Sequence, residues 1–231
     1  MPKAAASRPF ILALAGVNGA GKSSVGGAIL ADHGLTWFNP DTCARELMAQ
    51  LGLVLEEANG RAWAQGRDRL EAAIAQGTNF AFETTLGART IPDLLAHATR
   101  THDVVVFFCG LSSPEQHIQR VHRRVAHGGH DIPEHKIRER WVTSRANLIR
   151  LLPLLARLQV FDNSAQAAPG HDIPDPQLVL ELVNGDVLFP GQGDILALKA
   201  TPDWARPIVQ AALESRQAPM PSAAPETPGE P

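Results

Sequence analysis

Several features that mark other classes of protein are scarce in this chain. Among its 231 residues are only two cysteines, Cys43 and Cys109, which lie far apart and match no metal-binding spacing. These facts exclude a disulfide scaffold and a cysteine-based metal site, so we expect a reduced, cytoplasmic protein. No apolar run approaches the about 20 residues that a membrane-spanning helix needs, and we therefore expect no membrane partner.

The chain also lacks an excess of charge of one sign. Its 21 basic and 24 acidic residues give a net charge of -3, which argues against a broad surface for nucleic acid. Four of the nine histidines, at positions 122, 127, 130 and 135, gather in one stretch, but their spacing fits no common zinc pattern. We expect no nucleic-acid partner and no structural metal.

One stretch near the N-terminus carries a specific signal. Residues 16–23 read GVNGAGKS, the Gly-x-x-x-x-Gly-Lys-Ser pattern of a P-loop. An apolar run at residues 10–15 precedes it and residues 25–31 continue with helical character, which places the motif at a strand-to-helix turn. This context disfavours an incidental glycine-rich turn. We predict that the loop binds a nucleoside triphosphate.

The residue types explain how this loop would hold phosphate. Its glycines, at positions 16, 19 and 21, let backbone N–H groups turn inward around a phosphate without a Cβ clash. Lys22 can reach the β- and γ-phosphate oxygens, and the Ser23 hydroxyl is placed to bind the Mg²⁺ that bridges them. The predicted nucleotide-binding residues of the loop are Gly16, Asn18, Gly19, Ala20, Gly21, Lys22, Ser23 and Ser24.

Apolar and helical segments alternate along the rest of the chain. Strands are expected at residues 35–39, 79–86, 102–109 and 159–164, and helices at 44–51, 56–76, 91–100, 114–126 and 134–150. The alternation predicts an α/β fold of P-loop NTPase type, with a parallel sheet flanked by helices. The Asn184-Gly185 pair between the apolar runs of residues 178–189 predicts an edge β-hairpin, a C-terminal appendage.

This pattern also predicts how the chain is organised. We expect a P-loop core at residues 1–165. A C-terminal hairpin and helix at residues 166–215 should pack on it, with the helix at 204–215. Residues 216–231 are rich in proline and alanine, so we expect a disordered tail.

Two arginine-rich helical segments, within residues 114–150, are joined by Gly128-Gly129. Beside a P-loop this arrangement predicts a lid that closes on phosphates. The alternative is a solvated, charged helical hairpin.

Two acidic residues are candidates for the chemistry. Asp41 follows the strand expected at residues 35–39, and ligands of open α/β sheets bind at the carboxyl ends of strands. There its carboxylate would accept a proton from an attacking hydroxyl, a contribution of about 10²–10⁴-fold. Alternatively Asp41 or Thr42 caps the next helix. Glu83 ends an apolar strand, where it must pair with a substrate hydroxyl, a lid arginine or hydrated Mg²⁺, unless it forms a structural ion pair.

An ordered set of segments resembles the zeta-toxin family of P-loop kinases, particularly its short bacterial members. The segments are residues 16–24, 39–41, 80–86, 120–133, 137–148 and 161–164, in the family's order. The resemblance implies ATP- and Mg²⁺-dependent phosphorylation of a nucleotide sugar, at the 3′-hydroxyl of the amino sugar in UDP-N-acetylglucosamine or a similar compound. It also implies a possible antitoxin protein as a partner.

The resemblance further implies roles for single residues on the donor and acceptor sides. Lys22 would bind the triphosphate, Asp41 would be the base, and Glu83 with Thr84 would help to hold the acceptor sugar.

For the lid, the resemblance implies that Arg124, with Arg120, stabilises the transition state, which is worth about 10³–10⁵ in rate for such arginines. Arg138 and Arg140 both fit the second lid arginine, and we favour Arg140. Asn163 would lie near the adenine.

The chain also departs from the family. Trp141 stands where a tyrosine is usual, and residues 51–66 match poorly, which leaves the nucleotide end of the acceptor site open. The alternatives are a kinase for another metabolite, such as a nucleoside or an antibiotic, and a non-kinase ATPase or nucleotide switch. The last is disfavoured because no Leu-Ser-Gly-Gly-Gln-like segment follows the loop. The residues do not distinguish a toxin from a metabolic enzyme.

Overall fold

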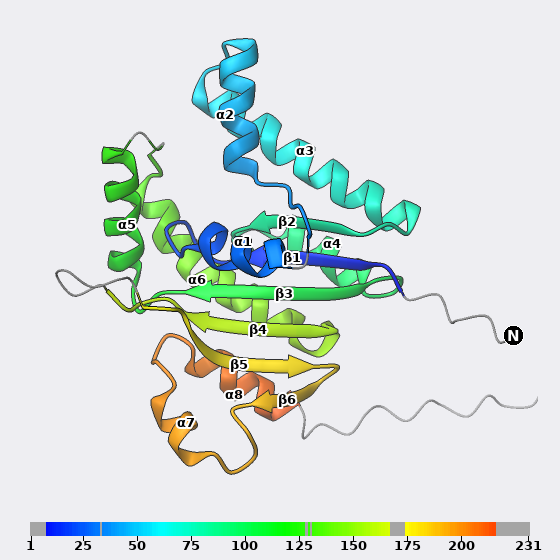
Figure 1. Cartoon of the computed structure of the whole chain (residues 1–231), viewed down its shortest axis with the longest axis vertical. Coiled ribbons are helices and arrows are strands. Elements are labelled where there is room, and N and C mark those ends of the chain that lie inside the picture. Colours follow the sequence, from blue (N-terminus) through cyan, green and yellow to red (C-terminus); the bar gives the residue numbers. More distant parts are fainter. Residues whose placement is uncertain (1–7, 33, 128, 130, 167–173, 216–231) are drawn as a thin grey trace, which may run out of the picture.

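A six-stranded sheet forms the centre of the molecule (Figure 1), which a computed structural model describes at residues 8–32, 34–127, 129, 131–166 and 174–215. The strands are β1 (Phe10–Ala15), β2 (Phe80–Thr84), β3 (Asp103–Gly110), β4 (Arg157–Asp162), β5 (Gln177–Val183) and β6 (Asp186–Phe189). Their order is β2-β1-β3-β4-β5-β6. The first four strands are parallel, and β5 and β6 are antiparallel to their neighbours.

Helices cover both faces of this sheet. The described helices are α1 (Lys22–Asp32), α2 (Pro40–Leu51), α3 (Leu55–Gln76), α4 (Thr90–Ala98), α5 (Pro114–Ala126), α6 (Glu134–Leu151), α7 (Ile195–Ala200) and α8 (Arg206–Ser215), with a short 3₁₀ turn at Leu152–Leu154. In Figure 1, α1 lies across one face, and α4, α6 and α8 lie behind the other. The α/β fold predicted from the sequence is confirmed, with the hairpin built into a mixed sheet.

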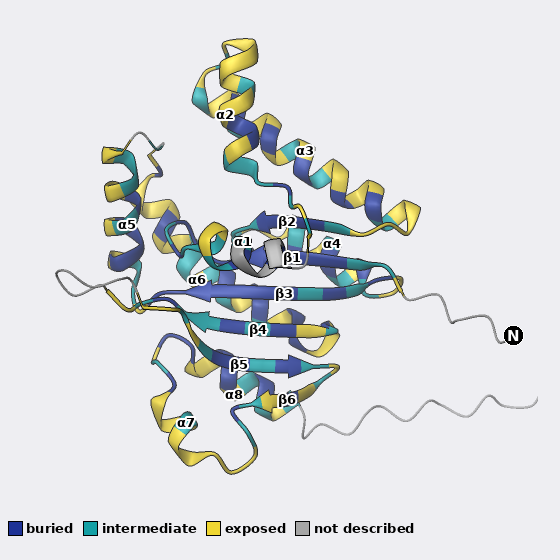
Figure 2. Cartoon of the chain, in the orientation of Figure 1, coloured by how far each residue is buried: buried dark blue, intermediate teal, exposed yellow. Residues whose placement is uncertain are grey.

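The alternation of side chains along β1 explains the two covered faces. Ile11, Ala13 and Ala15 belong to the large core shared with α4, α6 and α8, whereas Leu12 and Leu14 belong to a smaller core with Leu30 of α1. A parallel strand that is buried on both sides requires such a continuous apolar sequence. Figure 2 shows the resulting contrast between the buried strands and the exposed outer surfaces of α2 and α3.

The segment after α1 differs from its prediction as a strand at residues 35–39. It makes a single parallel bridge, in which Phe38 N–H donates to Ala81 O at 2.8 Å and Phe38 O accepts from Glu83 N–H at 2.9 Å. The strand prediction was wrong because helix α2 begins at once, at Pro40 rather than residue 44. Its cap is Asn39, whose Oδ1 accepts from Thr42 N–H at 3.1 Å, and not Asp41 or Thr42.

The C-terminal part continues the sheet. β5 and β6 form the predicted hairpin, and its turn residues Asn184 and Gly185 have positive φ angles of +48° and +85°. The sequence did not reveal α7, which Asp194 caps through a 3.0 Å bond from Ala197 N–H. The predicted tail at residues 216–231 lies outside the described residues. Among the described helices, none combines the length and apolar composition that a membrane span requires.

Candidate functional site

The P-loop follows β1 at the carboxyl ends of the four parallel strands. Gly16, Gly19 and Gly21 have φ angles of +136°, +81° and +87°, which side chains rarely tolerate. Space is restricted as well, because a Cβ at Gly16 would lie 2.2 Å from Cys109 O of β3, and one at Gly19 would lie 2.8 Å from His117 O of α5. The glycines predicted from the motif are therefore required by both conformation and packing.

Two neighbouring elements hold the loop by its carbonyl groups. Asn163, directly after β4, donates from Nδ2 to Ala20 O at 2.8 Å and is only 8% exposed. His117 of α5 lies with Nδ1 2.8 Å from Asn18 O, and its burial lowers its pKa to about 4. No sequence motif identified His117, whose neutral ring donates to this backbone carbonyl.

Helix α1 begins at the last residues of the motif. Lys22 is its first residue, and Ser24 N–H donates to Gly21 O at 3.1 Å. Ser23 and Ser24 are exposed, while Lys22 is half-buried. Burial lowers the pKa of Lys22, and the nearby carboxylates of Glu83 and Asp41 oppose that shift. The lysine ammonium therefore sits where the negative charge of phosphate would be stabilising.

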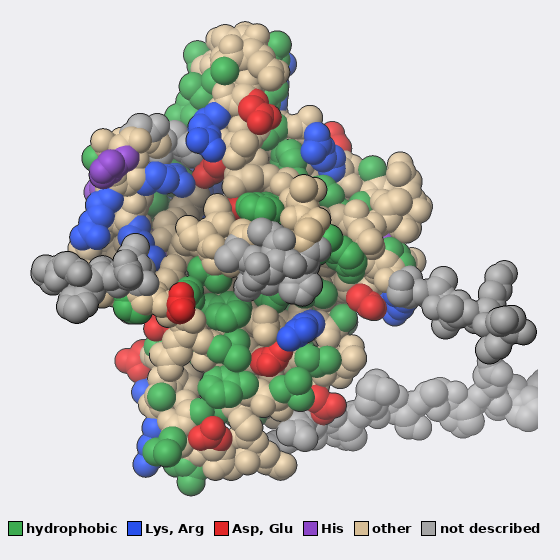
Figure 3. All heavy atoms as spheres, viewed as in Figure 1, with side chains coloured by type: hydrophobic (Ala, Val, Ile, Leu, Met, Phe, Trp, Pro, Cys, Tyr) green, Lys and Arg blue, Asp and Glu red, His purple; other side chains and the backbone are tan. Residues whose placement is uncertain are grey.

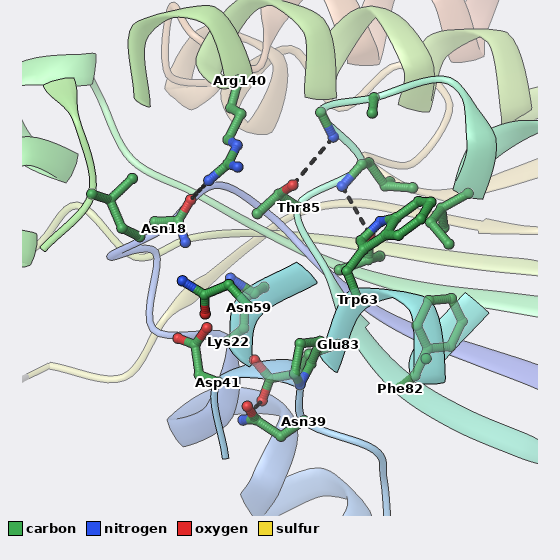
Figure 4. Close-up of a pocket in the computed structure, with 18 of the residues that line it drawn as sticks. Asn18, Lys22, Asn39, Asp41, Asn59, Trp63, Phe82, Glu83, Thr85 and Arg140 are labelled. Atoms are coloured by element: carbon green, nitrogen blue, oxygen red, sulfur yellow. Dashed lines mark hydrogen bonds between the residues drawn. The ribbon is translucent and has the colours of Figure 1, made fainter. Parts of the chain in front are cut away.

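A cavity of about 360 Å³ opens beside the P-loop, between the start of α2, helix α3, the end of β2 and the start of α6 (Figure 4). The predicted site residues that line it are Asn18, Lys22, Asp41, Glu83, Thr84 and Arg140. The P-loop, Asp41 and Glu83 thus line the same cavity. This agrees with the prediction that their segments meet at the carboxyl ends of the strands.

Asp41 lies in the first turn of α2 and points into this cavity. Its Oδ2 is 3.2 Å from Nη1 of Arg124 on α5, and the two side chains are 42% and 38% exposed. The structure thus brings together the predicted base and the first predicted lid arginine. Their partial exposure leaves both groups accessible to a ligand.

Asn39 positions the acidic residues. Besides capping α2, it donates from Nδ2 to Glu83 Oε1 at 2.9 Å, and Glu83 Oε1 also accepts from Trp37 Nε1 at 3.0 Å. Glu83 is 8% exposed, so these two neutral donors compensate for its burial. Neither Asn39 nor Trp37 was predicted as a site residue, although an Asn before a Pro is a recognisable helix start.

The end of β2 is braced by helix α6. Thr84 Oγ1 accepts from Leu86 N–H at 3.1 Å, and Leu86 is buried with a positive φ of +52°. Asn147 donates from Nδ2 to Leu86 O at 2.6 Å, and Ser144 Oγ donates to Thr85 O. These bonds fix the turn that forms one wall of the cavity.

The structure distinguishes the two candidates for the second lid arginine. Arg140 lines the cavity and donates from Nη1 to Asn18 Oδ1 at 2.8 Å, while burial lowers its pKa, partly opposed by the charges of Glu139 and Asp41. Arg138 is exposed and pairs with Glu115 Oε1 at 2.5 Å. Arg140 is therefore the arginine that faces the P-loop.

Arg120 lies apart from the cavity. Its Nη2 donates to Asn163 O at 2.7 Å and to Ala165 O at 3.3 Å, and burial lowers its pKa. The residue thus secures the segment after β4 and is not brought to Asp41. Figure 3 shows basic side chains gathered over the surface of α5, to which Arg120 and Arg124 belong.

The lid helices contact the loop through an apolar cluster. Val121 of α5 and Ile137 of α6 pack with Val17 of the P-loop and with Ile132 between the helices. Gly128 and His130, in the predicted hinge, lie outside the described residues. The helical pair thus has an apolar inner face on the P-loop and a charged outer face, and its closure on phosphates stays a prediction.

Sequence reasoning missed one wall of the cavity. Asn59, Trp63 and Arg67 of α3 line it. The segment was predicted as a helix, and its poor match to the zeta-toxin family left the nucleotide end of the acceptor site without assigned residues. The spacing of these three residues, four positions apart, was the available signal, because residues four apart share one face of a helix.

Comparison with solved structures shows the same fold in other proteins. The AvrRxo1-ORF1:-ORF2 complex with ATP has a TM-score of 0.62 and 14% identity, over 86% of this chain and 65% of the other. The native complex has a TM-score of 0.58 and 16% identity, over 90% and 71% of the two chains. The PezAT toxin-antitoxin system of Streptococcus pneumoniae has a TM-score of 0.50 and 17% identity, over 69% of each chain.

These likenesses concern the fold. The chain spans 65% of the length of the first two AvrRxo1 chains that it matches. No curated protein sequence matches the chain.

A family model described as "AAA domain" matches residues 11–147, from the first strand through the P-loop, α2, β2 and most of α6. The match covers more than half of the chain and includes the cavity and its arginine-bearing helices. The chain therefore belongs to the AAA domain family, within which it has a P-loop kinase-like fold.

Proposed function

We propose that the protein is an ATP-dependent kinase that phosphorylates a hydroxyl of a nucleotide sugar, with the 3′-hydroxyl of the amino sugar in UDP-N-acetylglucosamine as the leading candidate. One observation carries this proposal: the P-loop lysine and the Asp41 carboxylate line the same cavity of about 360 Å³. A hydrolase or a switch needs room for a water molecule only. A cavity of this size accommodates an organic acceptor, which favours a kinase.

The donor side of the proposed reaction rests on the P-loop. Positive-φ glycines turn its backbone N–H groups inward, and Lys22 at the start of α1 supplies a positive charge. Support for ATP as the donor comes from a protein of similar fold whose structure was solved with ATP.

The residues present also fit a Mg²⁺ ion. Asn39 Nδ2 lies 3.5 Å from Ser23 Oγ and 2.9 Å from Glu83 Oε1, so a hydroxyl and a carboxylate oxygen flank one amide near the first turn of α1. Oxygen ligands and water are what Mg²⁺ prefers. Ser23 would hold the ion, which when bound would neutralise charge on the β- and γ-phosphates.

The chemistry of the chain's own residues follows from this arrangement. The acceptor hydroxyl oxygen attacks the γ-phosphorus, the bond from that phosphorus to the ADP oxygen breaks, and the hydroxyl proton passes to Asp41 late in the step. Arg124 and Arg140 neutralise charge on the transferring group. In the described structure Arg124 binds Asp41 at 3.2 Å, so the guanidinium and the base are already adjacent.

Two further observations support the zeta-toxin reading. The six matching sequence segments include Asp41, Glu83 and Asn163, which the fold brings to one edge of the sheet or to the loop itself. One of the similar folds is that of PezAT, described as a toxin-antitoxin system, and others are ORF1:ORF2 complexes. We therefore include a protein partner, and a cytoplasmic location where ATP is available, in the proposal.

The test is a direct assay of phosphate transfer. Purified protein is incubated with ATP, Mg²⁺ and a panel of nucleotide sugars, nucleosides and aminoglycosides, and products are identified by mass spectrometry. A gain of one phosphate on UDP-N-acetylglucosamine is expected, with Asp41→Asn slower by about 10²–10⁴-fold. Asp203→Asn, at a residue 88% exposed in its side chain, is the matched control.

The product found in this assay distinguishes the proposed kinase from the alternative functions. Phosphorylation of a nucleoside or an antibiotic instead would identify the alternative metabolite kinase, and ATP hydrolysis without any phosphorylated acceptor would favour an ATPase. Wild-type turnover by Asp41→Asn would remove the proposed base. Growth arrest on expression, relieved by Asp41→Asn, would identify a toxin.

A further inference from the structure

One face of helix α3 forms a continuous wall of the cavity. Its cavity-lining residues are Asn59, Trp63, Gly66 and Arg67, spaced by four, three and one positions, as expected for one helical face. At a rise of about 1.5 Å per residue, the stretch from Asn59 to Arg67 is about 12 Å long. This wall extends well beyond the place where a single hydroxyl group would meet Asp41.

The way α3 packs leaves the wall facing the cavity. Its buried face is made mostly of small residues, among them Ala58, Ala62 and Gly66, so the helix lies close to Phe38. A Cβ at Gly66 would lie 2.7 Å from Phe38 Cε1. Trp63, next to this close contact, remains 44% exposed. A large aromatic side chain thus stays accessible on the cavity wall, where a ligand can cover it.

Two flat side chains lie next to each other on this wall. The Arg67 guanidinium carbon is 5.3 Å from the centre of the Trp63 ring, and Arg67 is oriented by bonds of 2.6 and 2.9 Å to Asp68 Oδ1. Indole rings and guanidinium planes are the groups on which nucleobases stack in proteins. This wall therefore has side chains on which a planar ring of a ligand can stack.

Asn59 lies at the other end of the wall, nearest to the proposed chemistry. Figure 4 shows it pointing toward Asp41, with Trp63 further along the same helix. Within the described residues its side-chain amide makes no hydrogen bond to protein, although it is half-buried.

Lys136 and Arg140 of α6 also line the cavity. There Lys136 pairs with Glu139 at 3.2 Å, and Arg140 donates to Asn18 at 2.8 Å. Both side chains carry positive charge that an anionic group of a ligand would meet.

We propose that Trp63 and Arg67 bind a planar heteroaromatic ring of the acceptor, and that Asn59 binds polar groups of the same molecule beside Asp41. The inference rests on the proposed function and deepens it, since it names the residues of this chain that bind the ring of the nucleotide sugar. The ring stacks on the indole face, the phosphorylated hydroxyl lies at Asp41, and the intervening anionic groups face Lys136. Trp63 is thus a specificity-determining residue for the acceptor.

The kinetic test compares acceptors with and without the ring. For UDP-N-acetylglucosamine, Trp63→Ala is expected to raise KM by about 5- to 150-fold, the range of base-stacking effects, with a smaller change in kcat. Trp63→Phe keeps an aromatic face and should stay within a few-fold of wild type. With N-acetylglucosamine 1-phosphate, which lacks the ring, Trp63→Ala should leave KM unchanged. Arg61→Ala, outside the cavity wall on the same helix, is the matched control.

A binding measurement separates this inference from the proposed function. With the donor site filled by a non-hydrolysable ATP analogue and Mg²⁺, uridine, cytidine, adenosine and guanosine diphosphates are titrated while tryptophan fluorescence is followed. At least one of them should quench the wild-type signal, and Trp63→Phe, which retains the other three of the four tryptophans, should lose that quenching.

The outcomes are distinguishable. Quenching that depends on Trp63, without phosphate transfer to any acceptor, would sustain the ring site and reject the kinase. Phosphorylation of UDP-N-acetylglucosamine with an unchanged KM in Trp63→Ala would sustain the kinase and overturn the ring site. An equal rise of KM for the acceptors with and without the ring would also overturn it, because the indole would then contact the sugar. Absence of Trp63-dependent quenching by all four nucleotides would do the same.

Discussion

The P-loop and the neighbouring cavity are built differently: the loop depends on its backbone conformation, and the cavity depends on side chains. The P-loop is shaped by backbone: its glycines have positive φ angles, and neighbouring side chains hold its carbonyl groups at Asn18 and Ala20. The cavity that we propose for the acceptor is shaped by side chains, and two of them, Asp41 and Trp63, are 42% and 44% exposed. A phosphate is the same in every nucleotide, so a fixed backbone can bind it. Acceptors differ, and side chains on a helix can change without disturbing the loop.

Removing the charge on the donor side should have the largest effect on turnover. Lys22→Ala is expected to lower kcat by up to about 10³-fold, because it removes a fixed cation from developing phosphate charge. Steady-state kinetics with ATP as the varied substrate measure this loss. Lys199→Ala, in the last turn of α7, is the control that should behave as wild type. If Lys22→Ala kept its kcat, the loop would bind nucleotide without taking part in transfer.

The backbone character of the donor side can be tested through stability. Gly16→Ala combines a φ of +136° with a Cβ placed 2.2 Å from Cys109 O, and should lower the free energy of unfolding by about 3 kcal/mol or more. Gly185→Ala has a φ of +85° but no atom within 4 Å of its Cβ, so only the strain of about 1–2 kcal/mol applies. Urea denaturation of both variants compares them. Equal losses would mean that packing against β3 does not constrain the loop.

The bond between α5 and the P-loop should make stability depend on pH. Burial lowers the pKa of His117 to about 4, so between its ordinary pKa of about 6.5 and pH 4 the unfolded chain binds a proton that the folded protein does not. Stability is therefore lost as the pH falls through this window, by at most about 3 kcal/mol at 1.4 kcal/mol per unit. Unfolding measured at pH 7, 6, 5 and 4 should show a smaller decline for His117→Gln. The same decline in both proteins would contradict the assignment.

The smallest expected effect is the difference in kcat between variants of two arginines on helix α6, Arg140 and Arg138. Arg140→Ala should lower kcat by about 10²-fold because its guanidinium faces the P-loop and Asn18. Arg138→Ala breaks only an exposed pair with Glu115, which is worth about 0–1 kcal/mol, and should leave turnover within about twofold. Kinetics of the two single variants provide the comparison. A larger loss in Arg138→Ala would reverse the assignment of the lid arginine.

The sequence was informative where backbone geometry restricts residue choice. A glycine pattern between an apolar run and a helix predicted the P-loop, and apolar runs predicted the strands that are buried on both faces. Asp41 was singled out because ligands of open α/β sheets bind at the carboxyl ends of strands, and Glu83 because an uncompensated charge at the end of an apolar strand is costly. The hairpin at Asn184-Gly185 was predicted from backbone geometry, since few residues accept the positive φ angles of its turn.

The sequence was less informative where packing between distant segments determines the structure or the role of a residue. Residues 35–39 have the composition of a strand, but the cap at Asn39 starts a helix immediately after one bridge. Arg120 looks like a lid arginine until the fold places the carbonyls of residues 163 and 165 within its reach. The residues of the α3 wall were not predicted because residues 51–66 match the zeta-toxin family poorly, and only the fold shows that Trp63 is accessible beside the cavity.

The contacts of the Trp204 indole limit how far the chain can be truncated from its C-terminus without removing residues that support the P-loop. It donates from Nε1 to Asp162 Oδ1 at 3.0 Å and packs so closely on β3 that a Cβ at Gly110 would lie 2.3 Å from its ring. The next residue after Asp162 is Asn163, which holds the P-loop carbonyl of Ala20. A truncation that ended with the family match at residue 147 would remove all three residues that support the nucleotide loop from this side. A fragment that keeps this support of the P-loop therefore extends at least to Trp204.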